Sequence, residues 1–461
     1  MKLSSSSIIF LLGIVGIYSI PISHDSPIGF GQNTTGGAGG VEYHVNTLKE
    51  LKDALLNNDN PNDPKIIYID SPINGYYYDD GSLMTEENLA PGFTFEKYIN
   101  CFTEDGKEWL ETPECDEIEK LRKNGMKPLQ NQIKVKVTSN TSIIGNGDAS
   151  RLEELVIQVG SVDNVILQNL SIQAPNDLFP QWKTDDGWEC KYDAVVIQNA
   201  TNVWIDNCLF DDGNKRVELA PIYFGQHVER HDGLIDIING SDLITLSNNR
   251  FTNHKKTLLI GNSDSRISDR NYLRVTMYNN VFINCWQRMP RVRFGKLHIF
   301  NNYYYSDNFR DYPVTYNDDG TVSLTHIFLG LGIESDILSE YNSFNYEQLK
   351  SFTNSTAVIL ANYGGYQFYD NGSKYNGHKI NINELAKKEF KLNVSNTKTK
   401  NLINGDTNPA WVNATFSTNI FKPKQFYNYK IVKNIEKINN LKNLIPTWMF
   451  ANDSTNEDSS E

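Results

Sequence analysis

The sequence predicts an all-β fold, a parallel β-helix whose coils stack as a solenoid. The chain has 461 residues, with 24 tyrosines, 22 phenylalanines and 31 glycines against 6 methionines, a composition that favours strands and turns over helices. A stronger observation is a repeat in which an alternating apolar run ends in asparagine and an apolar residue follows three positions later. Five segments fit this repeat: Val165–Asn169, Val203–Asn207, Ile244–Asn248, Val275–Asn279 and Leu297–Asn301, followed by Ile172, Phe210, Phe251, Phe282 and Tyr304.

The spacing of the repeat fits stacked coils. Successive asparagines are separated by 38, 41, 31 and 22 residues. The shortest step is about one coil, and the longer steps are one coil plus a loop. Strands that stack in register place like residues above one another, so an asparagine at each bend can bond to that of the next coil. The alternative is a sandwich of unrelated strands that end in Asn turns, but the recurring residue three positions on favours the solenoid.

The ends of the chain predict the compartment. Residues 1–20 have the pattern of a secretory signal peptide, because one lysine precedes an apolar run, 8–20, that is too short to span a membrane. We expect the β-helix domain at 24–448 and a disordered acidic tail at 449–461. No later stretch approaches 18 apolar residues, so a secreted protein without a membrane partner is expected. Ten Asn-x-Ser/Thr sequons make it a candidate glycoprotein.

A solenoid also needs caps at its ends. Thr47 and Glu50 fit a capping box, and the apolar residues that follow have helical spacing, so a short N-terminal capping helix is predicted. A C-terminal helical segment is predicted from Ile431, Ile435, Ile438 and Leu441, with Pro446 ending it. The polar, irregular stretch 76–130 is interpreted as an insertion or long loop.

The five cysteines match no zinc pattern and leave one thiol unpaired. Cys101 and Cys115 flank one short segment and can form a bridge, whereas Cys208 and Cys285 lie in strand-like runs where burial is expected. The formal net charge of −13 argues against nucleic acid as the main partner, since phosphate binding needs a basic face. Nothing in the sequence indicates an obligate oligomer, so a monomer is expected.

Three aspartates stand out by their surroundings. Asp193 begins the strand-like run 193–197, and Asp232 and Asp236 lie in the heptapeptide 231–237. Residues four apart in a strand point to one face, so Asp232 and Asp236 are expected to converge, with Asp193 one coil earlier. Three carboxylates on adjacent coils make an oxygen-rich site suited to Ca²⁺. On these residues alone, the alternative that all three are merely exposed stays open.

A cationic cluster accompanies the aspartates. Arg288, Arg291 and Arg293 fall within six residues, and Lys255 and Lys256 precede an apolar run that ends before a glycine. On an acidic protein, a local cationic cluster near a carboxylate site indicates contact with an anion. The alternative is that these side chains pair with the excess of Asp and Glu.

Patterns for other chemistries are missing from the sequence. It contains no Gly-x-Ser-x-Gly, no His-Glu-x-x-His and no phosphate loop. Polysaccharide hydrolysis needs paired carboxylates, but the adjacent pairs 185–186 and 211–212 would face opposite ways on a strand. A non-catalytic, wall-binding β-helix is the remaining alternative. Four histidines have no evident partner: His227, His231, His254 and His298.

Several motifs occur in order over most of residues 29–305: Gly29–Gly40, Ser139–Gly145, Phe179–Asp193, Val203–Cys208, Asp232–Asp236, His254–Lys256 with Gly261, and Arg288–Gly295 running into Asn301–Tyr303. Together, and in this order, they resemble the pectate lyases of polysaccharide lyase family 1, closest to the bacterial-type enzymes. The resemblance implies a right-handed parallel β-helix that cleaves α-1,4-polygalacturonate by β-elimination, leaving 4,5-unsaturated oligogalacturonates.

The resemblance also implies residue roles. Asp193, Asp232 and Asp236 match the family's Ca²⁺ ligands. Pectin lyases share the fold but lack this acidic cluster and cleave methylated polymer without calcium, so the three aspartates favour pectate. The remaining matches are the base that removes the C5 proton, Arg288, and two residues that hold substrate carboxylates, Lys256 and Arg293. Because the ordinary pKa of arginine lies above about 12, such a base predicts an alkaline optimum.

The chain departs from the family pattern at a few positions. Asn207 stands where the family usually has histidine, and because it falls on the asparagine repeat, a structural role is expected. Tyr278-Asn279 replaces a common His-Asn pair. Lys191 occupies a position that carries a further acidic ligand in some members, so that carboxylate is absent.

Overall fold

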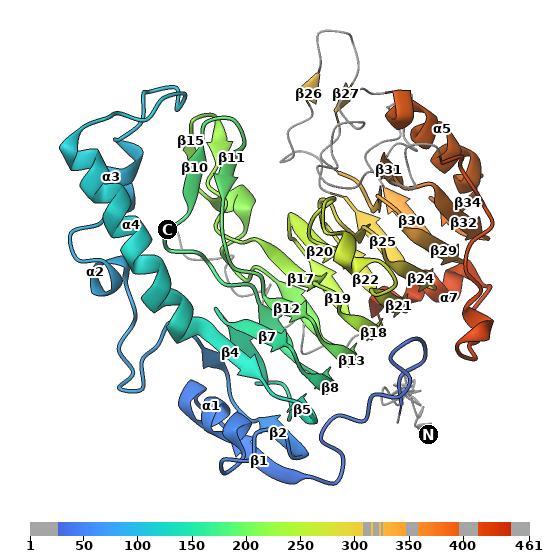
Figure 1. The fold of residues 1–461 in the computed structure, drawn as a ribbon, viewed down its shortest axis with the longest axis horizontal. Coiled ribbons are helices and arrows are strands. Elements are labelled where there is room, and N and C mark those ends of the chain that lie inside the picture. Colours follow the sequence, from blue (N-terminus) through green and yellow to red (C-terminus); the bar gives the residue numbers. More distant parts are fainter. Residues whose placement is uncertain are drawn as a thin grey trace, which may run out of the picture.

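In a computed structural model, the chain forms three long parallel sheets that run side by side as a β-helix (Figure 1). The structure describes residues 26–307, 315–316, 322–323, 326–346, 358–395 and 414–443. The predicted signal peptide, the predicted acidic tail and Pro446 lie outside the described residues. No helix within these ranges is long and apolar enough to cross a bilayer.

Each coil contributes one strand to each sheet in turn. The first sheet contains β4 (Lys134–Val137), β7 (Val156–Gly160), β12 (Val195–Gln198), β17 (Gly233–Ile238), β20 (Lys256–Ile260), β23 (Arg291–Val292), β28 (Leu329–Gly332) and β31 (Leu360–Tyr363). The second contains β1 (Val41–Val45), β2 (Lys65–Ile69), β5 (Thr141–Gly145), β8 (Asp163–Gln168), β13 (Thr201–Asp206), β18 (Asp242–Ser247), β21 (Arg274–Tyr278), β24 (Lys296–Phe300), β29 (Asp336–Glu340) and β32 (Gln367–Asn371). The third contains β3 (Ile73–Asn74), β6 (Arg151–Glu153), β9 (Ser171–Gln173), β14 (Leu209–Asp211), β19 (Arg250–Thr252), β22 (Val281–Ile283), β25 (Tyr303–Ser306), β30 (Ser343–Tyr346), β33 (Lys374–Tyr375) and β34 (His378–Lys379).

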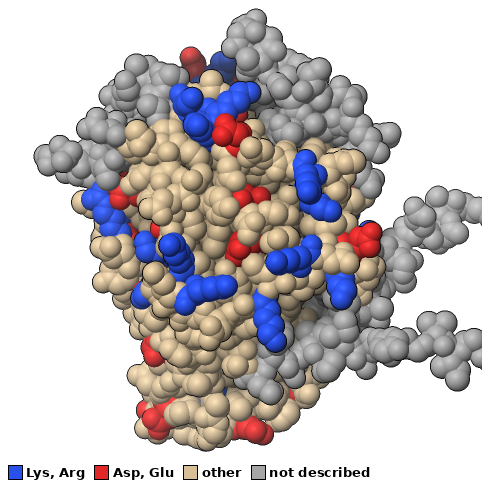
Figure 2. All heavy atoms as spheres, turned by 90° about the vertical axis from the view of Figure 1, so that its right-hand side faces the viewer, with Lys and Arg blue, Asp and Glu red and all other residues tan. Residues whose placement is uncertain are grey.

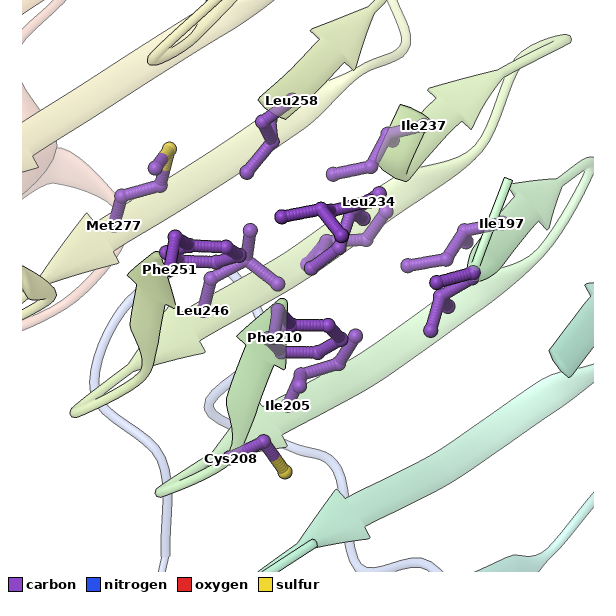
Figure 3. Close-up of a cluster of buried hydrophobic side chains, with 14 of the residues drawn as sticks. Ile197, Ile205, Cys208, Phe210, Leu234, Ile237, Leu246, Phe251, Leu258 and Met277 are labelled. Atoms are coloured by element: carbon purple, nitrogen blue, oxygen red, sulfur yellow. The ribbon is translucent and has the colours of Figure 1, made fainter. Parts of the chain in front are cut away.

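The predicted repeat is confirmed as β8, β13, β18, β21 and β24, which pair in parallel and in register. The residue three positions after each asparagine lies on the third sheet and stacks on its counterpart: Phe210 pairs with Ile172, and the Phe210–Phe251, Phe251–Phe282 and Phe282–Tyr304 ring centroids are 5.1, 4.8 and 4.8 Å apart. Together with aliphatic residues from all three sheets, these rings fill the interior of the coils (Figure 3). Like-on-like stacking therefore builds the core.

The asparagine ladder is shifted by one position from the prediction. The predicted asparagines bond to each other at only some steps, as in Asn207 Nδ2 to Asn169 Oδ1 at 2.7 Å. They adopt left-handed backbone conformations, with φ between 52° and 58° in all five repeats, and so turn the chain at the bend. The following residue points inward, and there a continuous, fully buried ladder forms through Asn249, Asn280, Asn302 and Asn342.

We expect the buried asparagine ladder to contribute to the stability of the fold. The amide of Asn280 donates to Leu246 O and Asn302 Oδ1, and its oxygen accepts from the backbone and side chain of Asn249. In Asn280→Ala the remaining buried groups lose their partners, so we expect the free energy of unfolding to fall by about 3 kcal/mol. Denaturant unfolding should show no such loss in Asn428→Ala, where the asparagine is exposed. Equal stability of the two variants would contradict the ladder's role.

Helices cover both ends of the β-helix. The predicted capping helix is α1 (Leu48–Leu56), with the Thr47–Glu50 capping box formed and one face buried. The predicted C-terminal helical segment is shorter than expected: α7 (Ile435–Asn439) continues into η6 (Asn440–Asn443), and Ile431 lies outside it. It packs on the third sheet and not over the end of the stack. A further helix that we did not predict, α5 (Ile382–Ser395), packs on β31 and β32. In Figure 1, α1 and α5 mark opposite ends of the stack.

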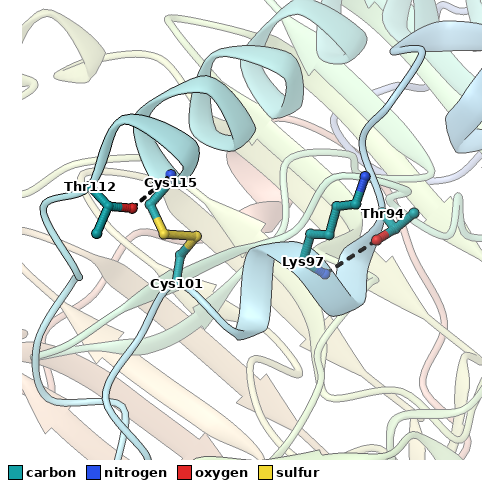
Figure 4. Close-up of a disulfide and its surroundings, with 5 residues drawn as sticks. All are labelled: Thr94, Lys97, Cys101, Thr112 and Cys115. Carbon is teal, nitrogen blue, oxygen red and sulfur yellow. Dashed lines mark hydrogen bonds between the residues drawn. A yellow bond between two sulfur atoms is a disulfide. The ribbon is translucent and has the colours of Figure 1, made fainter.

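Of the two interpretations of 76–130, the long loop is wrong, because the segment holds α2 (Glu86–Leu89), α3 (Phe95–Ile99) and most of α4 (Pro113–Ile133). It is a helical insertion between β3 and β4. The Cys101–Cys115 disulfide is formed and joins the end of α3 to the start of α4, which Thr112 caps (Figure 4). The segment packs on a second core of aromatic residues outside the coils. Cys208 and Cys285 are buried, as expected.

Several short hairpins and 3-10 turns lie outside the three sheets of the β-helix. These are the hairpins β10–β11 (Gln181–Lys183, Gly187–Glu189), β15–β16 (Ile222–Tyr223, Gln226–His227) and β26–β27 (Thr315–Tyr316, Val322–Ser323), and the 3-10 turns η1 (Val217–Leu219), η2 (Ile267–Asp269) and η5 (Pro423–Gln425). The first two hairpins project beside the first sheet, next to the 76–130 helices (Figure 1).

Candidate active site

The six residues singled out by the sequence all lie on or beside four adjacent strands of the first sheet. Asp193 and Asp232 precede β12 and β17, and Asp236 lies within β17. Lys256 is the first residue of β20, whereas Arg288 precedes and Arg293 follows β23. Residues distant in sequence are therefore stacked one coil apart on one side of the β-helix.

Asp193 and Asp236 converge on Gly233. The Gly233 N–H donates to Asp193 Oδ1 at 2.7 Å. A Cβ at position 233 would lie 2.6 Å from Asp193 Oδ1 and 2.8 Å from Asp236 Oδ1. Asp236 Oδ1 is buried and has no hydrogen-bond partner among the described residues. The missing side chain of Gly233 thus leaves room for two carboxylate oxygens to face one point, and one of them is unsatisfied.

The electrostatics of this carboxylate group are unfavourable without a cation. Burial, and then the charge of Asp232, raise the pKa of Asp236 to about 7. Burial, followed by repulsion from Asp236 and Asp232, raises the pKa of Asp193 well above its ordinary value. Both shifts have the same origin, since anions crowded in a poorly solvated site resist ionisation. Arg288 opposes the shift at both positions, which shows that its charge lies nearby.

Asp232 is held differently from the other two aspartates. Its Oδ1 accepts from Lys256 Nζ at 3.1 Å, and Lys256 Nζ also lies 3.4 Å from Glu229 Oε2. Glu229 is buried and pairs with Lys255 as well. Burial lowers the pKa of Lys256, but the neighbouring Cys190, Asp232 and Glu229 outweigh it, so the net pKa is raised and the ammonium is retained.

Arg288 occupies an unusual backbone position. Its φ is +61°, in the left-handed region that a non-glycine residue seldom adopts, and its carbonyl is tied to the Leu258 N–H at 2.7 Å. Its Nε is buried and receives no hydrogen-bond partner from the part of the chain that the structure describes. A strained residue that carries an unsatisfied donor next to a carboxylate site is a feature of functional positions.

Arg293 and Arg291 flank this position. Arg293 is buried, with its Nε paired to Asp264 and its Nη1 donating to Gly261 O at 2.8 Å. Two of its guanidinium nitrogens therefore already bond to protein groups. Arg291 stacks over the Tyr363 ring at 4.2 Å. Its Nε is also unpartnered, and burial, with help from Arg293, lowers its pKa to about 10. The three arginines thus concentrate positive charge beside β23.

A buried polar network supports the site, which sequence reasoning missed. His254 Nδ1 lies 2.7 Å from Asp212 Oδ1, and His254 Nε2 lies 2.8 Å from the Asp232 carbonyl oxygen. The interpretation of the histidines as unpartnered is therefore wrong. The sequence did contain a sign of this network, the Asp211-Asp212 pair, which was considered only for hydrolysis. Asp212 is buried and bonds to His254, while Asp211 accepts from the Gly213 N–H.

The other three histidines are also bonded. His227 lies against the Ala220 carbonyl, and His231 bridges the carbonyls of Pro175 and Lys215. His298 contacts Tyr427 and Glu340 and is fully buried, which indicates a structural role.

The carboxylates at this site have the donor atoms that a divalent cation requires. Among the described residues, no three His, Cys, Asp or Glu side chains are gathered closely enough to form a complete metal cluster. Asp193 and Asp236 nevertheless supply two converging carboxylates, one with an unsatisfied oxygen, and these are the hard oxygen donors that Ca²⁺ prefers. The residues fit a calcium site whose remaining ligands come from elsewhere, such as water or the substrate.

Comparison with known proteins identifies the family of the chain. A family model described as pectate lyase matches residues 117–415. The pectate lyase of Bacillus subtilis (strain 168) is 33% identical over 365 residues, which cover 77% of this chain and 82% of that enzyme. The chain belongs to the pectate lyase family. Pectate lyase D of Dickeya chrysanthemi is 41% identical over 53% of this chain and 60% of its own length.

Solved structures of the family have the same fold. A thermostable pectate lyase matches with a TM-score of 0.74 and 31% identity, over 91% of this chain and 95% of that chain. A pectate lyase bound to a hexasaccharide matches with a TM-score of 0.71 and 27% identity, over 93% and 97%. Membership gives the enzyme class: a pectate lyase, a carbon–oxygen lyase that acts on polygalacturonate.

Proposed function

We propose that this pectate lyase cleaves polygalacturonate by calcium-dependent β-elimination at the first sheet, with Asp193, Asp232 and Asp236 as metal ligands and Arg288 as the base. The observation that carries the proposal is the convergence of Asp193 and Asp236 on Gly233, with one buried oxygen unsatisfied, beside the unsatisfied Nε of Arg288. An acidic pocket next to cationic side chains suits a polyanion whose carboxylates are bridged by a cation.

Each residue has a distinct task in this mechanism. Asp193, Asp232 and Asp236 would hold Ca²⁺, which would lower the negative charge of the substrate carboxylate next to C5 and so make the C5 proton easier to remove. Arg288 takes that proton, the C–H electron pair forms the C4=C5 double bond, and the C4–O4 bond breaks. Water protonates the departing O4, since no side chain is assigned as a general acid. Lys256 and Arg293 hold substrate carboxylates, and Lys256 exchanges its contact with Asp232 for the substrate.

The direct test follows the unsaturated product by its ultraviolet absorbance. Purified protein is incubated with polygalacturonate in the presence of Ca²⁺ and, in parallel, of EDTA. We expect an absorbance increase with Ca²⁺, none with EDTA, and recovery when Ca²⁺ is restored. New reducing ends without absorbance would indicate hydrolysis, and activity on methylated pectin that persists in EDTA would indicate pectin-lyase chemistry.

Calcium affinity is predicted to depend on pH. The pKa of Asp236 is raised to about 7, and that of Asp193 is raised in the same direction. Calcium binds the ionised carboxylates, so protons compete with it below these pKa values. Calcium affinity should therefore reach its maximum above neutral pH and fall as the pH drops through about 7. Calorimetric titrations with Ca²⁺ at pH 6 and pH 8.5 would measure the difference. Equal affinity at both values would contradict the ligand assignment.

We further propose that the enzyme is secreted. The Cys101–Cys115 disulfide supports this, because disulfides persist in oxidising compartments and are rare in the cytosol. A polymeric wall substrate must also be met outside the cell. Detection of the enzyme in the culture medium, with the disulfide intact by mass spectrometry, would test the assignment.

A further inference from the structure

The C-terminal part of the chain carries a charge opposite to that of the rest. The described segments 358–395 and 414–443 contain eleven lysines and four acidic residues, a net charge of +7, whereas the whole chain has a net charge of −13. We call this surface the basic end. Its lysines are Lys374, Lys379, Lys387, Lys388, Lys391, Lys422, Lys424, Lys430, Lys433, Lys437 and Lys442.

Nearly all lysines of the basic end are exposed, and no carboxylate in the described part of the chain pairs with them. All except the half-buried Lys374 are exposed, and none forms an ion pair with a carboxylate of the described residues. Elsewhere on the protein exposed lysines do pair, as in Lys49–Asp53 and Lys120–Glu117. Figure 2, which faces this end of the stack, shows blue side chains spread over the face, with red ones at its top and centre.

Local structure places several of these lysines next to one another. Lys374 and Lys379 are directly opposed in the β33–β34 hairpin, an arrangement of like charges that destabilises a sheet. Lys387 and Lys391 are four apart on α5, where like charges also repel. The opposite face of α5 is buried through Ile382, Ala386 and Phe390, so the lysines point to solvent. Repulsion maintained in two neighbouring elements indicates a use for the charge.

The basic end is separate from the carboxylate site. Its helix α5 packs on β31 and β32, at the end of the stack. The 414–443 segment crosses the second and third sheets, where Tyr427 contacts His298 and Val432 bonds to Asn301. The carboxylates of the candidate active site lie on the first sheet, where Asp236 on β17 is four strands from β31. The arginines beside β23 are closer, and Arg291 contacts Tyr363 of β31, but the lysines of the basic end lie on later elements. The two surfaces can therefore contact different stretches of one long polymer.

We propose that the basic end is a second, non-catalytic binding surface for polygalacturonate, which holds the polymer while another stretch occupies the active site. This inference rests on the proposed function, because it takes the substrate to be a polyanion. The carboxylates of polygalacturonate complement the unpaired lysines, and an oriented cationic surface on an acidic protein raises the local concentration of an anionic polymer. Short oligogalacturonates cannot span both surfaces and do not benefit.

The test compares two variants with equal charge change. The first replaces Lys374, Lys379, Lys387, Lys388 and Lys391 by glutamine. The control replaces five exposed lysines at the other end of the molecule by glutamine: Lys49, Lys97, Lys107, Lys120 and Lys123. Retention on immobilised polygalacturonate is measured in EDTA, where catalysis is absent, against a salt gradient. We expect the first variant to elute at clearly lower salt than the wild type and the control. None of the three proteins should be retained on fully methylated pectin.

Kinetics separate this proposal from the assignment of the active site. With polymer and Ca²⁺, the first variant should show a KM raised by about tenfold and an unchanged kcat. With trigalacturonate, all three proteins should have the same kcat/KM. Equal retention and equal KM for both variants would overturn the second surface while leaving the active site intact. Absence of any lyase product from the wild type would instead overturn the proposed function, because retention in EDTA does not depend on turnover.

Discussion

Replacement of Arg288 by lysine is expected to lower kcat on polygalacturonate by about 10³-fold, within the range for removal of a positioned base. Lysine keeps the positive charge but loses the planar fork of the guanidinium, and its amine ends at a different point. The backbone contact that fixes the position, Leu258 N–H to the Arg288 carbonyl, does not involve the side chain. Folding should therefore be unchanged, as circular dichroism and the thermal midpoint would report.

Two measurements distinguish a base from a merely structural arginine. Arg266→Lys, at an exposed position, is the matched control and should retain full activity. The wild-type pH profile should have an alkaline optimum, because the fraction of neutral arginine increases with pH. Near-wild-type turnover of Arg288→Lys would remove Arg288 from the role of base, and an activity maximum below about pH 6 would do the same.

The coils were predictable because their determinants are local and repeated. Each alternating run and the aromatic residue that follows stack on copies of themselves, so Phe251 and Phe282 signal the same position in neighbouring coils. The sequence alone did not separate the asparagine that turns the chain, such as Asn279, from the buried ladder residue next to it, Asn280. That distinction depends on φ and on the direction of the side chain, which adjacent identical residues do not reveal.

The helices of 76–130 could not be predicted because their partners are distant. The buried face of α4 includes Arg122 and Gly125, and Pro128 lies inside the helix, so the apolar period is interrupted. Gly125 is needed because Phe179 packs against it: a Cβ there would lie 2.2 Å from the ring. By contrast, α5 carried a readable signal, since Asn381 caps it and Ile382, Ala386 and Phe390 have helical spacing.

The site was predictable as a set of residue types but not in its pairing. Asp236 lies within β17, whereas Asp232 lies before that strand and bonds to Lys256, a pairing that strand alternation did not predict. Glu229 and Asp212 support the site from loops and from the third sheet, and no local pattern connects them to it. Such contacts arise from the stacking of coils and follow only from the three-dimensional fold.

Asp236→Asn is expected to abolish calcium-dependent activity at ordinary Ca²⁺ concentrations. Asparagine keeps the size of the side chain but removes one negative charge from the site, and calcium affinity should weaken by about 100-fold, a step comparable to those by which ligand charge tunes calcium sites. Isothermal titration should report the weaker binding, and excess Ca²⁺ should restore part of the turnover. Undiminished affinity in the variant would exclude Asp236 as a ligand.

The same substitution should affect stability in the opposite direction when calcium is removed. A folded-state pKa of about 7 for Asp236, above its ordinary value of 3.8, means that the metal-free fold loses stability as the pH rises from about 4 to 7. Asparagine cannot ionise, so in EDTA at pH 8 Asp236→Asn should melt at a higher temperature than the wild type.

Gly233→Ala provides the complement, because its Cβ fills the space between the carboxylates of Asp193 and Asp236 without removing either charge. It should lose calcium binding and gain no stability at pH 8, which separates the need for an open cradle from the need for its charge.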